Sequence, residues 1–252
     1  MTTDDGRWTA PSPAQRSSLG TVVIATLVDQ IVSGALPVGT VLPAEAELGE
    51  QLGVSRTVIR ESVKSLQSKG LLSSRQGVGT VVRDMDAWDL IDEVVLSAMV
   101  KHDESLGILD DLVSVRAALE MAMAEEACRG QQAPDLGAVR TAYVEMTESS
   151  EDAAAFARAD VHFHDAVMTL SGNRLGRAIV TSIHDQARTT GRYHGSATRS
   201  NIEITLAEHR AVLDALEHRD GARAGQAMRA HILGSWERRR PAAADARETT
   251  AG

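Results

Sequence analysis

The pattern of apolar and polar positions predicts three helices and a hairpin in the first third of the chain. Val23, Leu27 and Ile31 recur at the spacing of one face of an amphipathic helix. Two shorter helical patterns follow, and Gly53 between them is typical of a tight turn. Next, two apolar pairs flank a polar centre that contains Gly77, which indicates a β-hairpin. The predicted elements are helices over 19–31, 44–52 and 55–69 and a hairpin over 71–82.

Beyond Ala87 the pattern is helical throughout, and no alternating strand pattern occurs. The loops between the predicted helices are short, so we expect neighbouring helices to run antiparallel in one bundle. The first of these helices is apolar enough to form a linker or part of a dimer contact. The predicted helices cover 87–100, 105–129, 135–148, 151–171, 174–193, 202–218 and 220–239.

The helix predicted at 55–69 carries positive charge at an unexpected end. Arg56 and Arg60 lie in and just after its first turn, where the helix dipole prefers Asp or Glu. In a winged helix-turn-helix, this end of the second helix enters the major groove, where arginines meet phosphates and guanine edges. The alternative is a solvated helix face, but the preceding helix, the turn and the hairpin favour DNA reading. The candidate DNA-binding residues are Ser55, Arg56, Thr57 and Arg60, with Gln76 and Gly77 at the wing tip.

Charge is divided unevenly along the chain. The formal net charge is −9, yet residues 13–83 carry seven Lys and Arg against five Asp and Glu. The acidic remainder is suited to a surface that does not contact DNA. No apolar run approaches the ~18 residues that a membrane span needs, and the first residues lack the features of a signal peptide. With Cys128 as the only cysteine, these features lead us to expect a cytoplasmic, nucleoid-associated protein without membrane contact.

Three predicted helices direct one aspartate and three histidines toward their apolar faces. Asp160 and His164 are four residues apart on one helix, and His209 and His231 each lie among apolar residues of two others. The simpler interpretation is three hydrogen-bonded core histidines. A buried carboxylate is costly unless it is paired, and a divalent metal would satisfy all four groups. Imidazole and carboxylate suit zinc, which we favour, and also Ni, Co, Fe or Mn.

One arginine also falls on an apolar face. Arg116 lies between Leu112 and Leu119, and Glu120 follows four residues later. One interpretation is an ion pair within the helix. The other is that Arg116 points into the metal cavity and binds a carboxylate through its planar fork.

The segment LPAEAELGEQLGVSRTVIRESVKSLQSKGLLSSRQGVGTVV resembles the DNA-binding domain of GntR-type bacterial transcription regulators. The resemblance extends over residues 19–83 and implies that Arg56 and Arg60 are the principal DNA contacts, supported by the other four candidates. This chain has Ala46 where the family usually carries an arginine that contacts DNA. The resemblance therefore implies one contact fewer, with a shifted operator preference or a lower affinity.

Residues from about 105 to 240 resemble the helical ligand-binding (FCD) domain of the fatty-acid-regulator-like branch of that family. In its metal-binding members the ligands are one Asp and three His, at positions matching Asp160, His164, His209 and His231. The sequence VRAALE resembles a motif whose arginine lines the effector pocket, which implies that role for Arg116.

Together these observations predict a mainly α protein: an N-terminal winged helix-turn-helix with a small β-hairpin wing, and a C-terminal all-α antiparallel bundle of the FCD type. We expect a homodimeric regulator, a repressor rather than an enzyme, that binds a palindromic double-stranded DNA operator and responds to a small carboxylate or sugar acid. The alternatives are a metalloenzyme fused to a DNA-binding module, and a regulator whose metal is purely structural. The predicted parts are a disordered tail (1–16), the DNA-binding domain (17–83), a linker helix (84–104), the metal- and effector-binding domain (105–240) and a second disordered tail (241–252).

Overall fold

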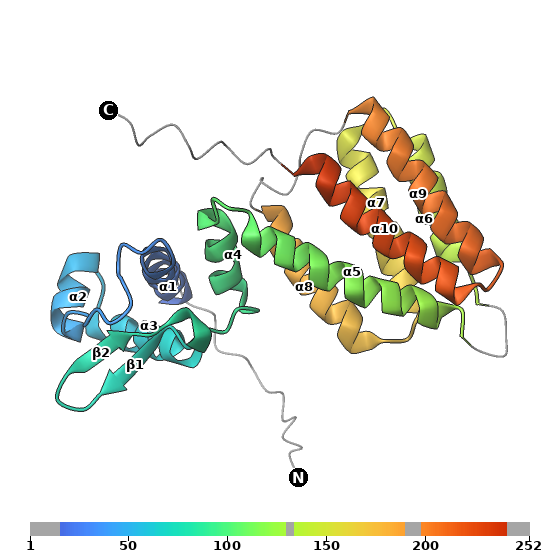
Figure 1. Cartoon of the computed structure of the whole chain (residues 1–252). Helices are drawn as coiled ribbons and strands as arrows, with labels where there is room; N and C mark the ends of the chain where they lie inside the picture. Colours follow the sequence, from blue (N-terminus) through green and yellow to red (C-terminus); the bar gives the residue numbers. More distant parts are fainter. Residues whose placement is uncertain (1–15, 130–133, 190–197, 241–252) are drawn as a thin grey trace, which may run out of the picture. The chain divides into compact units, whose positions relative to one another are not determined.

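The computed structural model describes residues 16–129, 134–189 and 198–240, which belong to two compact units (Figure 1). Unit 1 lies within Met1–His102 and unit 2 within Asp103–Gly252. The two predicted tails lie outside the described residues, apart from Arg16. None of the described helices is long and apolar enough to cross a membrane.

Unit 1 begins with three helices that share one small core. Helix α1 spans Arg16–Val32, α2 spans Glu45–Leu52 and α3 spans Arg56–Ser68. Leu27 and Val28 of α1 are buried together with Ile59 and Leu66 of α3, and α3 packs on both other helices. Gly53 ends α2 in the left-handed conformation, with φ at 66°, and so allows the sharp turn that separates α2 from α3.

The wing is an antiparallel hairpin made of β1 (Leu72–Arg75) and β2 (Gly79–Val82). In its register, Leu72 faces Val82 and Arg75 faces Gly79. Val41, in the connector between α1 and α2, forms an isolated bridge with Val81 and so extends the hairpin on its β2 side. The hairpin is therefore fixed to unit 1 along an edge and also through β1, which packs on α3.

The helix predicted at 87–100 begins later in the structure. Residues Met85–Ala87 form a single 3₁₀ turn, and helix α4 spans Glu93–His102. The reason is Asp92, whose side chain accepts hydrogen bonds from the backbone amides of Val94 and Val95 and so fixes the start of the helix. Helix α4 packs on α1 within unit 1.

Unit 2 consists of six helices in its described residues. Helix α10 packs along α5 and α9, α6 packs on α7, and α5 also contacts α7 and α8. Gly225 permits the close approach of α10 to α5, because a Cβ there would lie 3.0 Å from the carbonyl oxygen of Met121. The helices are α5 (Gly107–Ala127), α6 (Gly137–Glu148), α7 (Ala153–Leu170), α8 (Arg174–Thr189), α9 (Arg199–Glu217) and α10 (Gly221–Arg239).

The predicted fold class is confirmed: a winged helix-turn-helix is followed by an all-α unit. The predicted helices of unit 2 agree with the observed ones within three residues at each end that the structure describes. The end predicted at residue 193 lies outside the described residues.

We predict that Gly70→Ala destabilises unit 1 far more than Gly34→Ala. Both glycines have a φ of 79°, which costs an alanine about 1 kcal/mol. A Cβ at Gly70 would also lie 1.9 Å from the carbonyl oxygen of Ala87, whereas a Cβ at Gly34 meets no atom within 4 Å. We expect a loss of about 3 kcal/mol or more for Gly70→Ala in urea unfolding. Equal losses in the two variants would contradict the close approach.

Candidate metal centre and nucleic-acid interface

Helix α3 presents the predicted DNA-reading residues at its N-terminal end. The side chain of Ser55 caps the helix by accepting a hydrogen bond from the amide of Val58 at 3.4 Å. Arg56, Thr57 and Arg60 are exposed, and the buried face of the helix points away from them into the core. This end of α3 therefore offers free amide groups and two guanidinium groups to an anion, which is the requirement for binding a DNA backbone.

The acidic residues near this end of α3 do not bind its arginines strongly. The first turn of α3 contains no acidic residue. Arg60 Nε lies 3.7 Å from Glu61 Oε1, and both side chains are more than half exposed, so the pair adds little stability. At the tip of the wing, Gln76 and Gly77 are exposed as predicted. Ala46, which replaces the usual arginine, lies half-buried on α2 and adds no charge.

Unit 2 brings the four predicted metal ligands together from three helices. Asp160 and His164 come from α7, His209 from α9 and His231 from α10. One potential ligand atom from each residue lies within 4.8 Å of those of the other three. His164 Nε2 and His231 Nε2 are 3.2 Å apart, and His209 Nε2 lies 3.1 Å from Asp160 Oδ1. The cluster thus has the donor set and the spacing to hold a metal ion.

The hydrogen bonds around the cluster determine which ring nitrogen faces inward. His209 Nδ1 donates to the carbonyl oxygen of Thr205 at 2.8 Å, His164 Nδ1 to Glu120 Oε2 at 2.5 Å and His231 Nδ1 to Glu208 Oε2 at 2.9 Å. A carbonyl or carboxylate oxygen only accepts, so each Nδ1 carries the proton. In the neutral rings, every Nε2 then faces the cluster with a bare lone pair.

This arrangement fits a cation better than it fits ordinary core histidines. His209 Nε2 is buried without a hydrogen-bond partner, although it approaches Asp160. The lone pairs of His164 Nε2 and His231 Nε2 face each other with no proton between them in the neutral form. A divalent ion resolves both problems, since it accepts lone pairs from all three imidazoles and neutralises the carboxylate.

Electrostatics keep the groups in their ligating protonation states. Burial would raise the pKa of the Asp160 carboxyl, but when the imidazoles are protonated, His209 first, their hydrogen bonding and positive charge hold it well below its usual value. Burial lowers the pKa of His231 to about 3, and the nearby His209 contributes to this shift. The aspartate is therefore ionised and His231 neutral at pH 7, as metal binding requires.

Arg116 forms the ion pair within its helix, the first of the two interpretations of its sequence pattern. Its Nε donates to Glu120 Oε1 at 2.5 Å within α5, and this carboxylate is fully buried. The other oxygen of Glu120 accepts from His164 Nδ1. The ion pair within the helix thus lies at the border of the metal cluster, and one carboxylate joins the guanidinium to a predicted ligand.

Several supporting residues escaped the sequence pattern. Thr205 and Glu208 on α9 orient His209 and His231, and Arg238 of α10 holds Glu208 in turn through bonds of 2.9 and 2.7 Å. In the sequence, only the position of Glu208 directly before His209 could have indicated that Glu208 supports the cluster. His162, also on α7, lies outside the cluster, and its side chain is 65% exposed.

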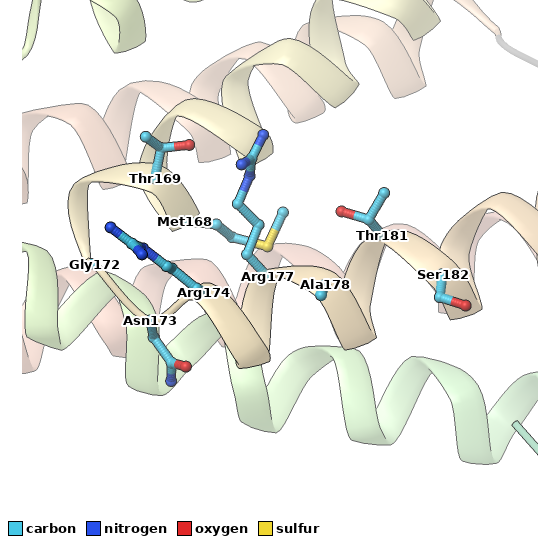
Figure 2. Close-up of a pocket in the computed structure, with 9 residues that line it drawn as sticks. All are labelled: Met168, Thr169, Gly172, Asn173, Arg174, Arg177, Ala178, Thr181 and Ser182. Atoms are coloured by element: carbon cyan, nitrogen blue, oxygen red, sulfur yellow. The ribbon is translucent and has the colours of Figure 1, made fainter. Parts of the chain in front are cut away.

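A separate groove lies between the end of α7 and the start of α8, with a volume of about 840 Å³ (Figure 2). Figure 2 shows Arg174 and Arg177 extending from the first turns of α8. Arg177 is engaged by Asp165 through bonds of 2.6 and 2.9 Å. Asn173 caps α8, since its side chain accepts from the amide of Gly176. None of the four clustered ligands lines this groove.

Known proteins match both units. Residues 19–82 match the gntR family of bacterial regulatory proteins, and residues 111–234 match the FCD domain. The galactonate operon transcriptional repressor of Escherichia coli (strain K12) is 32% identical over 216 residues, which cover 86% of this chain and 94% of that protein. The HTH-type transcriptional regulator LutR of Bacillus subtilis (strain 168) is 26% identical over 206 residues, which cover 80% and 92%.

Among solved structures, one concerning Lar of Listeria monocytogenes has a TM-score of 0.54 at 17% identity, and it covers 90% of this chain and 96% of that one. This likeness supports the fold. The family matches and the similarity to a transcriptional repressor place this chain among transcription regulators with a ligand-sensing domain, and not among enzymes. The chain belongs to the GntR family of bacterial regulatory proteins and carries an FCD domain in unit 2.

We predict that the protein holds about one divalent transition metal per chain, and that His209→Ala and His231→Ala each weaken metal retention about tenfold or more. The exposed His162 on the same helix as Asp160 supplies the control, since His162→Ala should retain the wild-type amount. Elemental analysis after dialysis measures the content. Chelation should also lower the melting temperature, because the metal binds the folded chain. Equal metal loss from all three variants would refute the cluster.

We predict that Arg60→Ala weakens specific DNA binding by ~1–3 kcal/mol without unfolding the protein, because it removes a base or phosphate contact. Lys101→Ala, which removes one exposed positive charge on α4, serves as the control. A titration of operator DNA across salt concentrations should show a shallower salt dependence for Arg60→Ala than for wild type if the contact is to a phosphate. Unchanged affinity at all salt concentrations would mean that α3 does not read DNA through Arg60.

Proposed function

We propose that this regulator binds a palindromic operator as a homodimer and releases it when a small carboxylate or sugar acid binds at a metal centre in unit 2. The observation that carries the proposal is the inward-facing set of bare Nε2 atoms beside Asp160. Histidines that serve only as core residues would use both ring nitrogens in hydrogen bonds. Three imidazoles fixed in the same tautomer around one carboxylate are instead typical of ligands that are oriented for a metal.

The donor set favours zinc, while nickel, cobalt, iron and manganese accept the same ligands. A bound divalent ion supplies a Lewis-acidic, positively charged centre that attracts carboxylate and hydroxyl oxygens. The protein residues around it determine which anion fits. Asp160 is 24% exposed, whereas the side chains of the three histidines are between 1 and 4% exposed. A ligand therefore approaches the centre from the side of Asp160.

Arg116 completes the proposed effector site. Its guanidinium lies next to the cluster because Glu120 binds both Arg116 and His164. A metal ion and a guanidinium in a buried site favour an anionic ligand over a neutral or cationic one. The similarity to a galactonate operon repressor supports a sugar acid as one member of this class and supports repression as the mode of action.

The DNA-binding half of the proposal rests on α3 and the wing. Ser55, Arg56, Thr57 and Arg60 supply the contacts from the helix, and Gln76 and Gly77 supply those from the wing. Helix-turn-helix proteins usually read two half-sites as dimers, which is the reason for proposing a homodimer and a palindromic operator. Release requires that the effector bind the two DNA-binding states with different affinity. A regulator of this kind acts where the DNA is, in the cytoplasm.

We predict that Arg116→Lys weakens effector binding about tenfold while the fold is retained. Lysine keeps the charge that Glu120 needs but loses the planar fork that grips a carboxylate. Alanine is a poorer test, because it would leave the buried Glu120 carboxylate unpaired. The measurement is a thermal unfolding screen of metal-loaded protein with D-galactonate, D-gluconate, L-lactate, pyruvate and citrate, followed by calorimetric titration of the strongest ligand.

At a hundredfold excess over its dissociation constant, the strongest ligand should stabilise the wild type by ~2.7 kcal/mol. The gain should shrink in Arg116→Lys and after chelation, and the same ligand should reduce operator binding. If none of these anions raised the melting temperature of metal-loaded protein, the metal would have only a structural role. Affinity that is unchanged both in Arg116→Lys and after chelation would place the ligand elsewhere.

A further inference from the structure

Helix α8 contributes a fourth histidine to the neighbourhood of the metal cluster. The starting point is a packed layer formed by Met123 of α5, Met168 of α7 and Val180 of α8, all of which are buried. Residues one helical turn away from these three positions form the next layer, because side chains three or four positions apart stack along one face of a helix.

The direction of each helix identifies that next layer. One turn before Met123 and Met168 lie Glu120 and His164, which are hydrogen bonded to each other, so α5 and α7 run in the same direction here. Helices α7 and α8 are joined by three residues and therefore run antiparallel. One turn after Val180 along α8 is His184, which consequently lies at the level of Glu120 and His164.

The electrostatic surroundings of His184 agree with this placement. The pKa of His184 is lowered to about 2, first by burial and then by the positive charge of Arg116, while the carboxylate of Glu120 acts in the opposite direction. His164 and Asp160 also influence it. The imidazole is therefore neutral at pH 7 and lies within electrostatic range of both the proposed effector arginine and the metal cluster.

His184 differs from the four clustered residues in two respects. It is outside the group whose ligand atoms all lie within 4.8 Å of one another. It is also half-buried, like Asp160, whereas the three clustered histidines are buried. His184 is thus a group outside the clustered ligands that is partly exposed, as Asp160 is.

We propose that His184 is an effector-binding residue that hydrogen-bonds a hydroxyl group of a carboxylate held by Arg116 and the metal. This inference rests on the proposed function and narrows the effector to the hydroxycarboxylates. A neutral imidazole donates one hydrogen bond and accepts one, which matches a hydroxyl group. A neutral imidazole carries no positive charge to attract a second carboxylate. A dicarboxylate therefore gains less binding affinity from His184 than a hydroxy acid does.

The test compares hydroxy acids with their deoxy counterparts in metal-loaded protein. The pairs are glycolate and acetate, L-lactate and propanoate, 3-hydroxybutyrate and butyrate, and D-galactonate and hexanoate. Calorimetric titration is carried out on wild type, on His184→Phe, which keeps a ring but removes both nitrogens, and on His184→Asn, which keeps hydrogen-bonding groups. His162→Phe on the exposed face of α7 is the matched control.

For the pair that wild type distinguishes best, His184→Phe should weaken binding of the hydroxy acid about five- to tenfold, which is the value of one hydrogen bond. Binding of the deoxy acid should change less than about twofold by the same reasoning. His184→Asn should recover part of the loss, and His162→Phe should behave as wild type. Metal content should stay at the wild-type level in every variant.

Other results would overturn the inference. If His184→Phe weakened binding of the hydroxy acid and of the deoxy acid equally, the substitution would have changed the shape of the binding site. If it weakened neither, the hydroxyl group of the effector would be bound by another residue. Metal loss comparable to that of His209→Ala would make His184 a ligand. If His184→Phe failed to fold, the test would rest on His184→Asn. The inference then requires that His184→Asn change the ratio of the affinities for the hydroxy acid and for its deoxy counterpart. If the wild-type protein binds carboxylates but prefers no hydroxy acid to its deoxy counterpart, only this inference is wrong. If the wild-type protein binds no carboxylate, the proposed function is wrong as well.

Discussion

The carboxylate of Glu120 is the contact on which the sensing unit depends. One oxygen accepts from Arg116 and the other from His164, and the side chain is fully buried. Burial alone would raise the pKa of this carboxyl, but Arg116 and His164 hold it far below its usual value. A buried charge persists only with such partners. Glu120 therefore fixes the position of the guanidinium and the tautomer of His164, a proposed metal ligand, at the same time.

The other two histidines are each oriented by an acceptor on α9. Glu208 binds His231 and is itself held by Arg238, and the carbonyl oxygen of Thr205 binds His209. Each imidazole thus has one nitrogen committed to a fixed acceptor. Because α5, α7, α9 and α10 each supply one part of this shell, a change in the cluster acts on the packing of four helices. In the proposed function, this is the physical route by which a bound anion alters the shape of unit 2.

In unit 1 the proposed DNA-binding side chains are exposed, whereas in unit 2 the clustered histidines are buried. The core of unit 1 is small, and Ile59 and Leu66 hold α3 so that Arg56 and Arg60 remain in solvent. The arginines oppose the dipole of their own helix when no DNA is present. Next to phosphates, the helix N-terminus and the guanidinium groups attract the same negative charge. In the proposed DNA complex, this attraction would recover the stability lost in the free protein.

Local patterns determined the helices, the turn at Gly53, the hairpin and the inward direction of the four clustered residues, since helical periodicity and turn residues act over a few positions. The start of α4 was misplaced because the cap formed by Asp92 outweighed the apolar pattern before it. Only the tertiary structure identified Glu120 as the partner of His164, 44 residues away, and Glu208 as that of His231. The inferred level of His184 also depends on the direction in which each helix runs, and no local pattern encodes which helices become neighbours.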